Sequence, residues 1–107
     1  MLNPAQVGAK NTVERITWVQ VAPDGTRIPQ DLTGATLTGR KQSTMDGETV
    51  AIDGTLTPVS PLTSGLFDWK RGTVDVSAGN VYEVQFKAAY TDYDLSMADL
   101  WVVEPAL

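Results

Sequence analysis

The sequence predicts an all-β protein, an antiparallel β-sandwich of about seven strands. Threonine and valine are frequent, with 13 and 12 copies in 107 residues, and β-branched side chains suit a pleated sheet better than a helix. No window holds the i, i+3, i+4, i+7 apolar pattern of a long helix. Glycine turns recur at the short spacing typical of a sandwich; they are Asp24-Gly25, Thr33-Gly34, Asp46-Gly47, Asp53-Gly54, Ser64-Gly65 and Ala78-Gly79.

Seven strands are expected between these turns. Their bounds are about 12–21, 35–43, 48–53, 55–59, 65–70, 81–91 and 95–104. In the first strand, Ile16 and Trp18 point to one face and the valines point to the other. We place Ile16 and Trp18 in the core, and a bulge in the middle of the strand would reconcile the two faces. The second, third and fourth strands are defined by the glycine turns that bound them.

The fifth and sixth strands show clear alternation. In the fifth, Phe67 and Trp69 alternate with Leu66 and Asp68. Because an unpaired carboxylate is costly to bury, we expect Phe67 and Trp69 in the core. The sixth strand carries charged or amide side chains on one face and apolar ones on the other, as a strand buried on one side requires. Its apolar positions are Tyr82, Val84, Phe86, Ala88 and Tyr90.

The seventh strand also has two distinct faces. Ala98, Leu100 and Val102 share one face, while Asp99 and Trp101 share the other. Because Asp99 carries a charge, we expect its face to point outward, toward solvent. This orientation leaves Trp101 partly exposed.

One domain is expected, at residues 12–104, because a chain of this length supports a single core. Residues 1–11 lack a strand pattern of their own, and we expect a flexible N-terminal arm there. Residues 105–107 form a C-terminal tail. Between the fifth and sixth strands, residues 71–80 form a polar connection in which Asp75 is able to cap a short turn.

The charge balance argues against two classes of partner. Lysine and arginine number 8 against 13 aspartates and glutamates, which gives a net charge of −5. A chain this acidic lacks the basic patch that attracts phosphate backbones and anionic membranes, so we expect neither nucleic acid nor a membrane as a partner. The polar first ten residues and the short apolar runs predict neither a signal peptide nor a membrane span.

The reactive side chains predict a protein that is not an enzyme and holds no cofactor. The chain has no His and no Cys, which excludes thiolate nucleophiles, imidazole acid–base pairs and most zinc sites. It contains neither a Ser-x-x-Lys motif nor a glycine-rich phosphate loop. Asp92, Asp94 and Asp99 are too few to form a calcium cage, and we interpret them as part of a solvated turn.

Four segments share a pattern with a known family. They are APDGTRIPQDLTGATL at 22–37, SGLFDW at 64–69, AGNVYEVQF at 78–86 and WVVEP at 101–105. These segments resemble the immunoglobulin-like N-terminal domain of phage baseplate upper proteins and related small phage virion proteins. The resemblance covers about residues 12–105, with one extra residue, Val81, between the glycine and the tyrosine of the third segment. It implies an immunoglobulin-like sandwich with Tyr82 at the position of a tyrosine corner.

The same resemblance implies a function. The chain would be a bacteriophage virion structural protein, a tail, baseplate or neck component that acts as a non-catalytic assembly module. It would be assembled in the bacterial host cytoplasm, and repeated copies would contact other virion proteins in a symmetric assembly. A capsid decoration protein is the alternative within this class. A carbohydrate-binding or adhesin module is the alternative from another class. It is motivated by the sandwich and its three tryptophans, of which Trp18 and Trp69 are expected in the core and Trp101 at the surface.

The candidate interface residues are Trp101, Val103 and Leu107. An exposed Trp101 beside Val103 makes an apolar spot of the kind that anchors protein interfaces. The tail that ends in Leu107 is free to order against a neighbour. We predict no catalytic, cofactor-binding or metal-binding residue.

Overall fold

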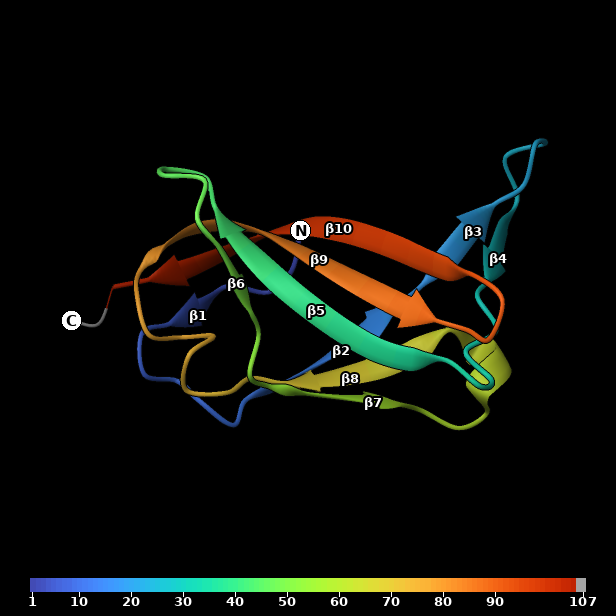
Figure 1. Ribbon diagram of the computed structural model, residues 1–107, viewed down its shortest axis with the longest axis horizontal. Coiled ribbons are helices and arrows are strands. Elements are labelled where there is room, and N and C mark those ends of the chain that lie inside the picture. Colours follow the sequence, from blue (N-terminus) through green and yellow to red (C-terminus); the bar gives the residue numbers. More distant parts are fainter. Residues whose placement is uncertain (106–107) are drawn as a thin grey trace.

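Two β-sheets stacked face to face enclose an aromatic core (Figure 1). The computed structural model describes residues 1–105. One sheet has the order β1-β10-β9-β5-β6, the other has the order β2-β8-β7, and β3 and β4 form a separate hairpin. All strand pairs are antiparallel except β1–β10, and the predicted all-β sandwich is confirmed. The elements are β1 (Ala5–Gln6), β2 (Val13–Thr17), β3 (Val19–Val21), β4 (Arg27–Pro29), β5 (Thr36–Ser43), β6 (Thr49–Ala51), β7 (Thr55–Pro58), a 3-10 turn (Leu62–Ser64), β8 (Leu66–Lys70), β9 (Asn80–Ala89) and β10 (Asp94–Glu104).

Aromatic side chains from both sheets meet in the centre of the sandwich. Phe67 and Trp69 of β8 contact Phe86 of β9 edge to face, with ring centroids 5.2 and 5.6 Å apart. Trp69 also meets Trp101 of β10 at 4.8 Å. These are the distances at which aromatic pairs attract beyond their simple burial. The two sheets are therefore held together chiefly by four large rings.

Most of the predicted core is confirmed. Ile16, Trp18, Phe67 and Trp69 are all buried. In β9 the alternation places four of the five apolar positions inside, and the fifth, Tyr90, is half-buried at the end of the strand; the four are Tyr82, Val84, Phe86 and Ala88. Period-two patterns therefore predict the buried faces of β8 and β9 correctly.

The expected orientation of β10 is wrong. Trp101 lies inside, Leu100 is exposed, and the face that carries Asp99 points inward. Asp99 is accommodated at the rim of that face, where its side chain remains 35% exposed and its carboxylate pairs with the Met1 ammonium at 3.2 Å. The charge that argued for an outward face is thus compensated by a group that the strand pattern does not contain.

The expected flexible arm at residues 1–11 is also wrong. Leu2 and Ala5 are buried, and the backbone N–H of Leu2 donates to the Leu100 carbonyl oxygen at 2.9 Å. Within this segment β1 pairs in parallel with the end of β10, with Ala5 opposite Val103. The segment therefore belongs to the sandwich and forms one edge of its larger sheet.

The first expected strand is divided into β2 and β3, which lie in different sheets. The break occurs at Trp18, whose N–H donates to the Gly65 carbonyl oxygen at 2.7 Å and whose carbonyl oxygen accepts the Gln30 N–H at 2.9 Å. Gly65 has a φ of 73°, and a Cβ there would lie 2.4 Å from the Trp18 carbonyl oxygen. Only glycine fits this crossing of the chain. Beyond it, β3 turns away to pair with β4.

Candidate functional site

The predicted interface residues do not form an exposed apolar spot. Trp101 is 0% exposed and Val103 is 1% exposed, because both face the interior of the sandwich. Leu107 lies outside the described residues. The prediction that Trp101 is partly exposed is therefore wrong, and any contact surface of this chain must be sought elsewhere.

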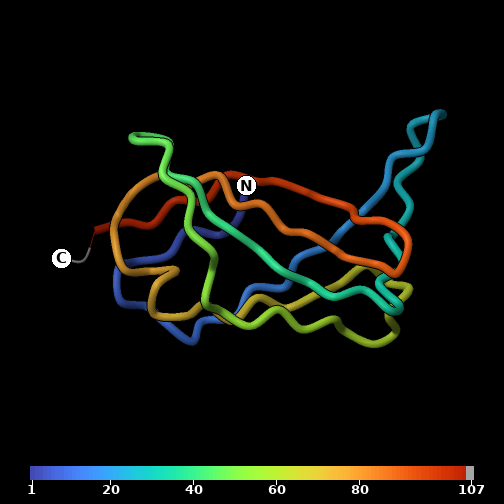
Figure 2. The backbone as a smooth tube through the Cα atoms, in the orientation of Figure 1, coloured from blue at the N-terminus to red at the C-terminus, as the bar shows by residue number. Residues whose placement is uncertain are grey.

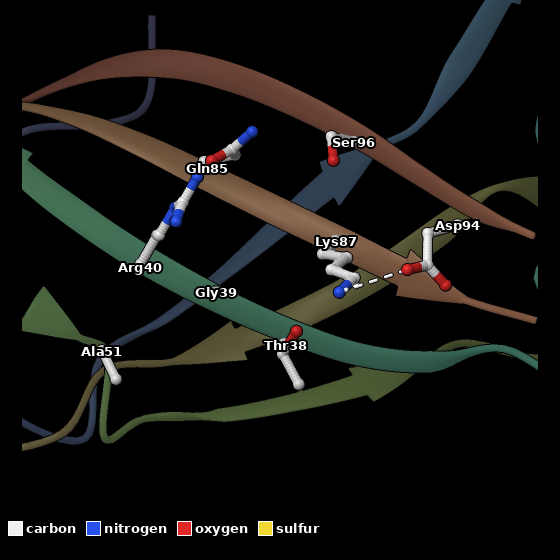
Figure 3. A pocket seen from close by; sticks show the side chains of 8 residues that line it. All are labelled: Thr38, Gly39, Arg40, Ala51, Gln85, Lys87, Asp94 and Ser96. Atoms are coloured by element: carbon white, nitrogen blue, oxygen red, sulfur yellow. Dashed lines mark hydrogen bonds and ion pairs between the residues drawn. The ribbon is translucent and has the colours of Figure 1, made fainter.

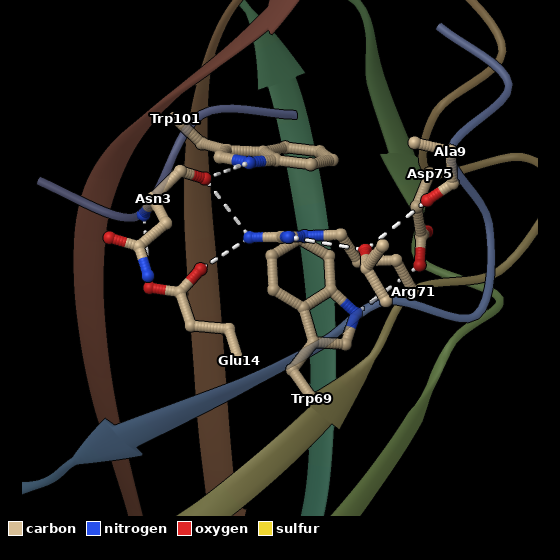
Figure 4. Close-up of polar contacts among 8 residues, drawn as sticks. Asn3, Ala9, Glu14, Trp69, Arg71, Asp75 and Trp101 are labelled. Atoms are coloured by element: carbon tan, nitrogen blue, oxygen red, sulfur yellow. Dashed lines mark hydrogen bonds and ion pairs between the residues drawn. The ribbon is translucent and has the colours of Figure 1, made fainter. Parts of the chain in front are cut away.

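A buried polar cluster surrounds Trp101 instead (Figure 4). The Arg71 guanidinium lies between the indole rings of Trp69 and Trp101, with its Cζ 5.0 and 5.1 Å from the ring centroids. It forms an ion pair with Glu14, and it donates to the Asn3 carbonyl oxygen at 3.0 Å. The Trp101 indole N–H donates to the same oxygen at 3.0 Å. These contacts join β2, β8, β10 and the N-terminal segment at one end of the core.

The Arg71–Glu14 pair has the properties of a structural element. Burial lowers the pKa of the Arg71 guanidinium, and the Glu14 carboxylate opposes that shift. Since the ordinary pKa of arginine exceeds 12, Arg71 remains charged and cannot exchange protons at neutral pH. The two buried charges neutralise each other, and the guanidinium also contacts two indoles, so removing either partner would leave an uncompensated charge in the core.

The polar connection at residues 71–80 is fixed by Asp75, which is fully buried. Its carboxylate accepts hydrogen bonds from the backbone N–H groups of Gly72, Gly54 and Asp53 at 2.9 to 3.0 Å, and from the Trp69 indole N–H at 3.2 Å. The bond to Gly72 closes the short turn expected there. Asp75 therefore ties its own connection, the loop between β6 and β7 and the central tryptophan together.

Lys41 and Tyr82 hold the other side of this connection. The Lys41 ammonium donates to the carbonyl oxygens of Val74 and Asp75 at 2.8 and 3.2 Å, and it lies 4.4 Å from the Tyr82 ring centroid. Burial lowers the pKa of Lys41, although the nearby Asp75 carboxylate opposes this shift. The Tyr82 hydroxyl donates to the Ala78 carbonyl oxygen at 2.9 Å, four residues upstream. A tyrosine corner makes this kind of bond.

A shallow hollow of about 470 Å³ lies on the outer face of the larger sheet (Figure 3). Its polar side chains bind one another: the Arg40 Nε donates to the Gln85 Oε1 at 2.7 Å, and the Lys87 ammonium pairs with Asp94 at 3.2 Å. The lining contains no aromatic ring. Ser96 and Thr38 lie opposite Lys87 in the neighbouring strands, and the Lys87 ammonium is engaged by Asp94. The residues that line it are Thr38, Gly39, Arg40, Ala51, Gln85, Lys87, Asp94 and Ser96.

The carboxylates considered for a cation site are not brought together. Asp94 pairs with Lys87, and Asp99 pairs with the Met1 ammonium. Within residues 1–105, no three His, Cys, Asp or Glu side chains are grouped so that they could hold a metal ion. Across the same residues, no helix has the length and apolar character needed to cross a membrane.

The tryptophans form no sugar-stacking platform. Trp18, Trp69 and Trp101 are all buried and contact other rings of the core. The expected core positions of Trp18 and Trp69 are confirmed, and Trp101 joins them, so the three side chains give the carbohydrate-binding alternative no exposed ring.

The feature that stands apart from the sandwich is the β3–β4 hairpin, residues 19–29, which projects from one end of the molecule (Figures 1 and 2). Val21 and Ile28 are 67% and 47% exposed. Val21 pairs with Arg27, so these two side chains share one face, and Ile28 lies on the opposite face. Neither hairpin face is covered by another strand.

The hairpin has a well-defined turn and a firm base. At the tip, Gly25 has a φ of 87° and the Asp24 carboxylate accepts the Thr26 N–H at 2.9 Å. At the base, the side-chain amides of Gln20 and Gln30 bond to each other, and Gln30 also donates to the Tyr90 hydroxyl at 3.1 Å. The hairpin therefore projects from the protein with a hydrogen-bonded turn at its tip and side-chain hydrogen bonds at its base.

Sequence reasoning identified the Asp24-Gly25 turn but not the hairpin as a separate surface. The segment Arg27–Pro29 is only three residues long and carries no alternation of its own. The sequence does indicate the division of the first expected strand, because Val19 and Val21 lie on the face opposite Ile16 and Trp18. A change of face within one strand indicates that the chain leaves its sheet.

Comparison with known proteins adds no assignment. The chain matches no protein-family model, and no curated protein sequence is significantly similar to it.

Proposed function

We propose that this chain is a non-catalytic assembly module, a structural protein of a bacteriophage virion that acts in the tail, baseplate or neck. The observation that carries the proposal is the β3–β4 hairpin, which presents exposed apolar side chains on a projection of a tightly packed body. The resemblance of residues 22–37, 64–69, 78–86 and 101–105 to immunoglobulin-like phage domains supports the choice of virion proteins as partners.

The β3–β4 hairpin would be more stable with a partner than without one. Two strands without a third are marginally stable in water, and exposed apolar side chains on them add no stability to the isolated chain. A partner that covers Val21 or Ile28 would stabilise the hairpin and gain binding free energy in the same step. A surface this small binds weakly in one copy, so it suits an assembly in which many copies bind together.

The proposal is tested by quantitative mass spectrometry of gradient-purified particles from the source lysate, scaled against the portal and major capsid proteins. Presence at low copy number supports a tail, baseplate or neck component. Presence at the copy number of the capsid protein indicates the decoration protein instead. Absence from particles contradicts the proposal.

A variant pair tests the role of the hairpin. The double variant V21S/I28S removes its exposed apolar side chains and is expected to reduce incorporation into particles at least severalfold. Val13→Ser is the matched control, since Val13 is exposed on β2, within the body of the sandwich. Equal incorporation of both folded variants would show that the hairpin is not the contact surface.

A further inference from the structure

The hairpin carries a charge that has no partner within the described chain. Arg27 is exposed and shares a face with Val21, directly across the two strands. None of the ion pairs formed by residues 1–105 includes Arg27. The hairpin face thus combines an apolar side chain with a free positive charge, and charge-assisted contacts to such a face require an anionic, partly apolar surface.

A surface of that kind lies at the other end of the same molecule. The turn between β5 and β6, residues 44–48, carries the exposed carboxylates Asp46 and Glu48 beside Met45, which is 84% exposed. The backbone N–H of Glu48 donates to the Asp46 carboxylate and lowers its pKa, so Asp46 is ionised at neutral pH. As with Arg27, no described ion pair involves either carboxylate.

The strand that follows this turn has an open edge. β6 is the last strand of the larger sheet, so one row of its backbone N–H and C=O groups has no partner strand. The outer edge of β4 in the hairpin is open in the same way. Figure 2 shows the hairpin and the β5–β6 turn at opposite ends of the long axis, projecting from the same side of the molecule.

We propose that the β3–β4 hairpin of one copy docks on the β5–β6 turn and the open edge of β6 in a second copy. Arg27 then pairs with Asp46 and Glu48, and Val21 packs against Met45. The two surfaces differ and lie at opposite ends of a molecule 43 Å long, so the contact is head-to-tail and repeats to form a ring or a filament. This inference rests on the proposed assembly function and specifies its partner as the chain itself.

The overall charge does not forbid such a contact. Each copy carries a net charge of −5, which repels other copies at long range. At physiological ionic strength this repulsion is screened beyond about 8 Å. The local attraction between Arg27 and two carboxylates therefore acts where the surfaces meet, at distances shorter than the screening length.

Cysteine cross-linking tests the contact directly, because the natural chain has no cysteine. Thr26→Cys labels the hairpin and Thr49→Cys labels β6, and both leave the charged side chains in place. Thr57→Cys on β7 is the matched control, since it is also an exposed threonine in a strand. Mixed T26C and T49C proteins, oxidised at high concentration, should form the mixed dimer about tenfold faster than T26C and T57C, because docking raises the effective concentration of the pair.

Charge exchange supplies a second test. Adding R27E to the T26C protein should remove the preference for T49C, and so should adding D46K and E48K to the T49C protein. Combining the two altered partners should restore it. Equal cross-linking to T49C and T57C, or no restoration in the combined pair, would overturn the head-to-tail contact.

The two proposals fail in different ways. If the protein is present in particles but T26C shows no preference for T49C, the assembly function stands and the partner is a different virion protein. If T26C prefers T49C but the protein is absent from particles, the copies associate and the virion role is wrong.

Discussion

Arg71 is a charged side chain that is buried in the core. Arg71 fills the space between two indole rings and neutralises Glu14, which would otherwise be a buried carboxylate without a counter-charge. Breaking such a pair is costly because the remaining ion stays in a medium that solvates it poorly.

Arg71→Ala is accordingly expected to reduce the free energy of unfolding by about 3–5 kcal/mol, as for other buried pairs that lose one partner. Urea denaturation measures this loss. Arg15→Ala is the control, because Arg15 is exposed and pairs with Asp68 at the surface, where solvent screens the interaction. Similar losses in the two variants would contradict a special role for the buried pair. The double variant E14L/R71M, which removes both charges, should lose less than Arg71→Ala.

At the scale of elements, the N-terminal segment is as much a part of the sandwich as the long strands. It contributes Leu2 to the core, a carbonyl oxygen of Asn3 to Arg71 and Trp101, and the edge strand β1. A segment that merely rested on the surface would make none of these contacts.

Leu2→Ala is expected to cost about 2–5 kcal/mol of unfolding free energy, the range for removing a buried leucine. Leu100→Ala is the control, because Leu100 is a partly exposed leucine of the strand that the segment covers. Hydrogen exchange at the Val7 amide, which donates to the Glu104 carbonyl oxygen at 2.9 Å, should accelerate in Leu2→Ala. A flexible arm would instead give a negligible loss and an unprotected Val7 amide.

The sequence predicts the buried faces of β8 and β9, because in each of these strands one face is more polar than the other. The alternation in β9 and the pair Phe67 and Trp69 in β8 located the core, because burial selects apolar side chains at every second position. The sequence failed where a distant group decided the outcome. Asp99 shares the inward face because Trp101 and Val103 on that face are buried against the other sheet, and Glu14 is buried because Arg71, 57 residues away, neutralises it.

The candidate surface was missed for a related reason. β4 and β1 contain three and two residues, too few for a periodic pattern. Trp101 is predicted at the surface because it shares a face with Asp99, and an exposed tryptophan would suit an interface, but the large apolar ring of the same side chain suits a core equally well. Which of these roles a tryptophan takes depends on the neighbours that the fold brings to it.

For the molecule as a whole, hydrogen-bonded carboxylates determine the response to acid. Hydrogen bonds from residues two positions further along the chain lower the pKa values of Asp24, Asp31 and Asp46. Each of these groups binds its proton less readily in the folded chain than in the unfolded chain. Their stabilisation is therefore complete above the unfolded pKa of about 4 and is lost as the pH falls through the lower, folded pKa.

The free energy of unfolding is expected to be nearly constant between about pH 6 and 8, because the chain has no histidine to titrate there. It should then decrease as the pH falls below about 4. Urea denaturation at a series of pH values measures both regimes. Stability that rises as the pH falls from 4 to 2 would contradict this assignment.

The pairing of Ala5 with Val103 joins β1 to β10, the first and last strands in chain order. During synthesis on the ribosome, β1 emerges before all the other strands, yet its place beside β10 does not exist until residues 94–104 have been made. Until then Trp69 and Arg71 lack their contacts with the indole of Trp101, so this end of the core is exposed to solvent. Closure is consequently a late step in folding, and such long-range pairing is slow because a large loop must close first.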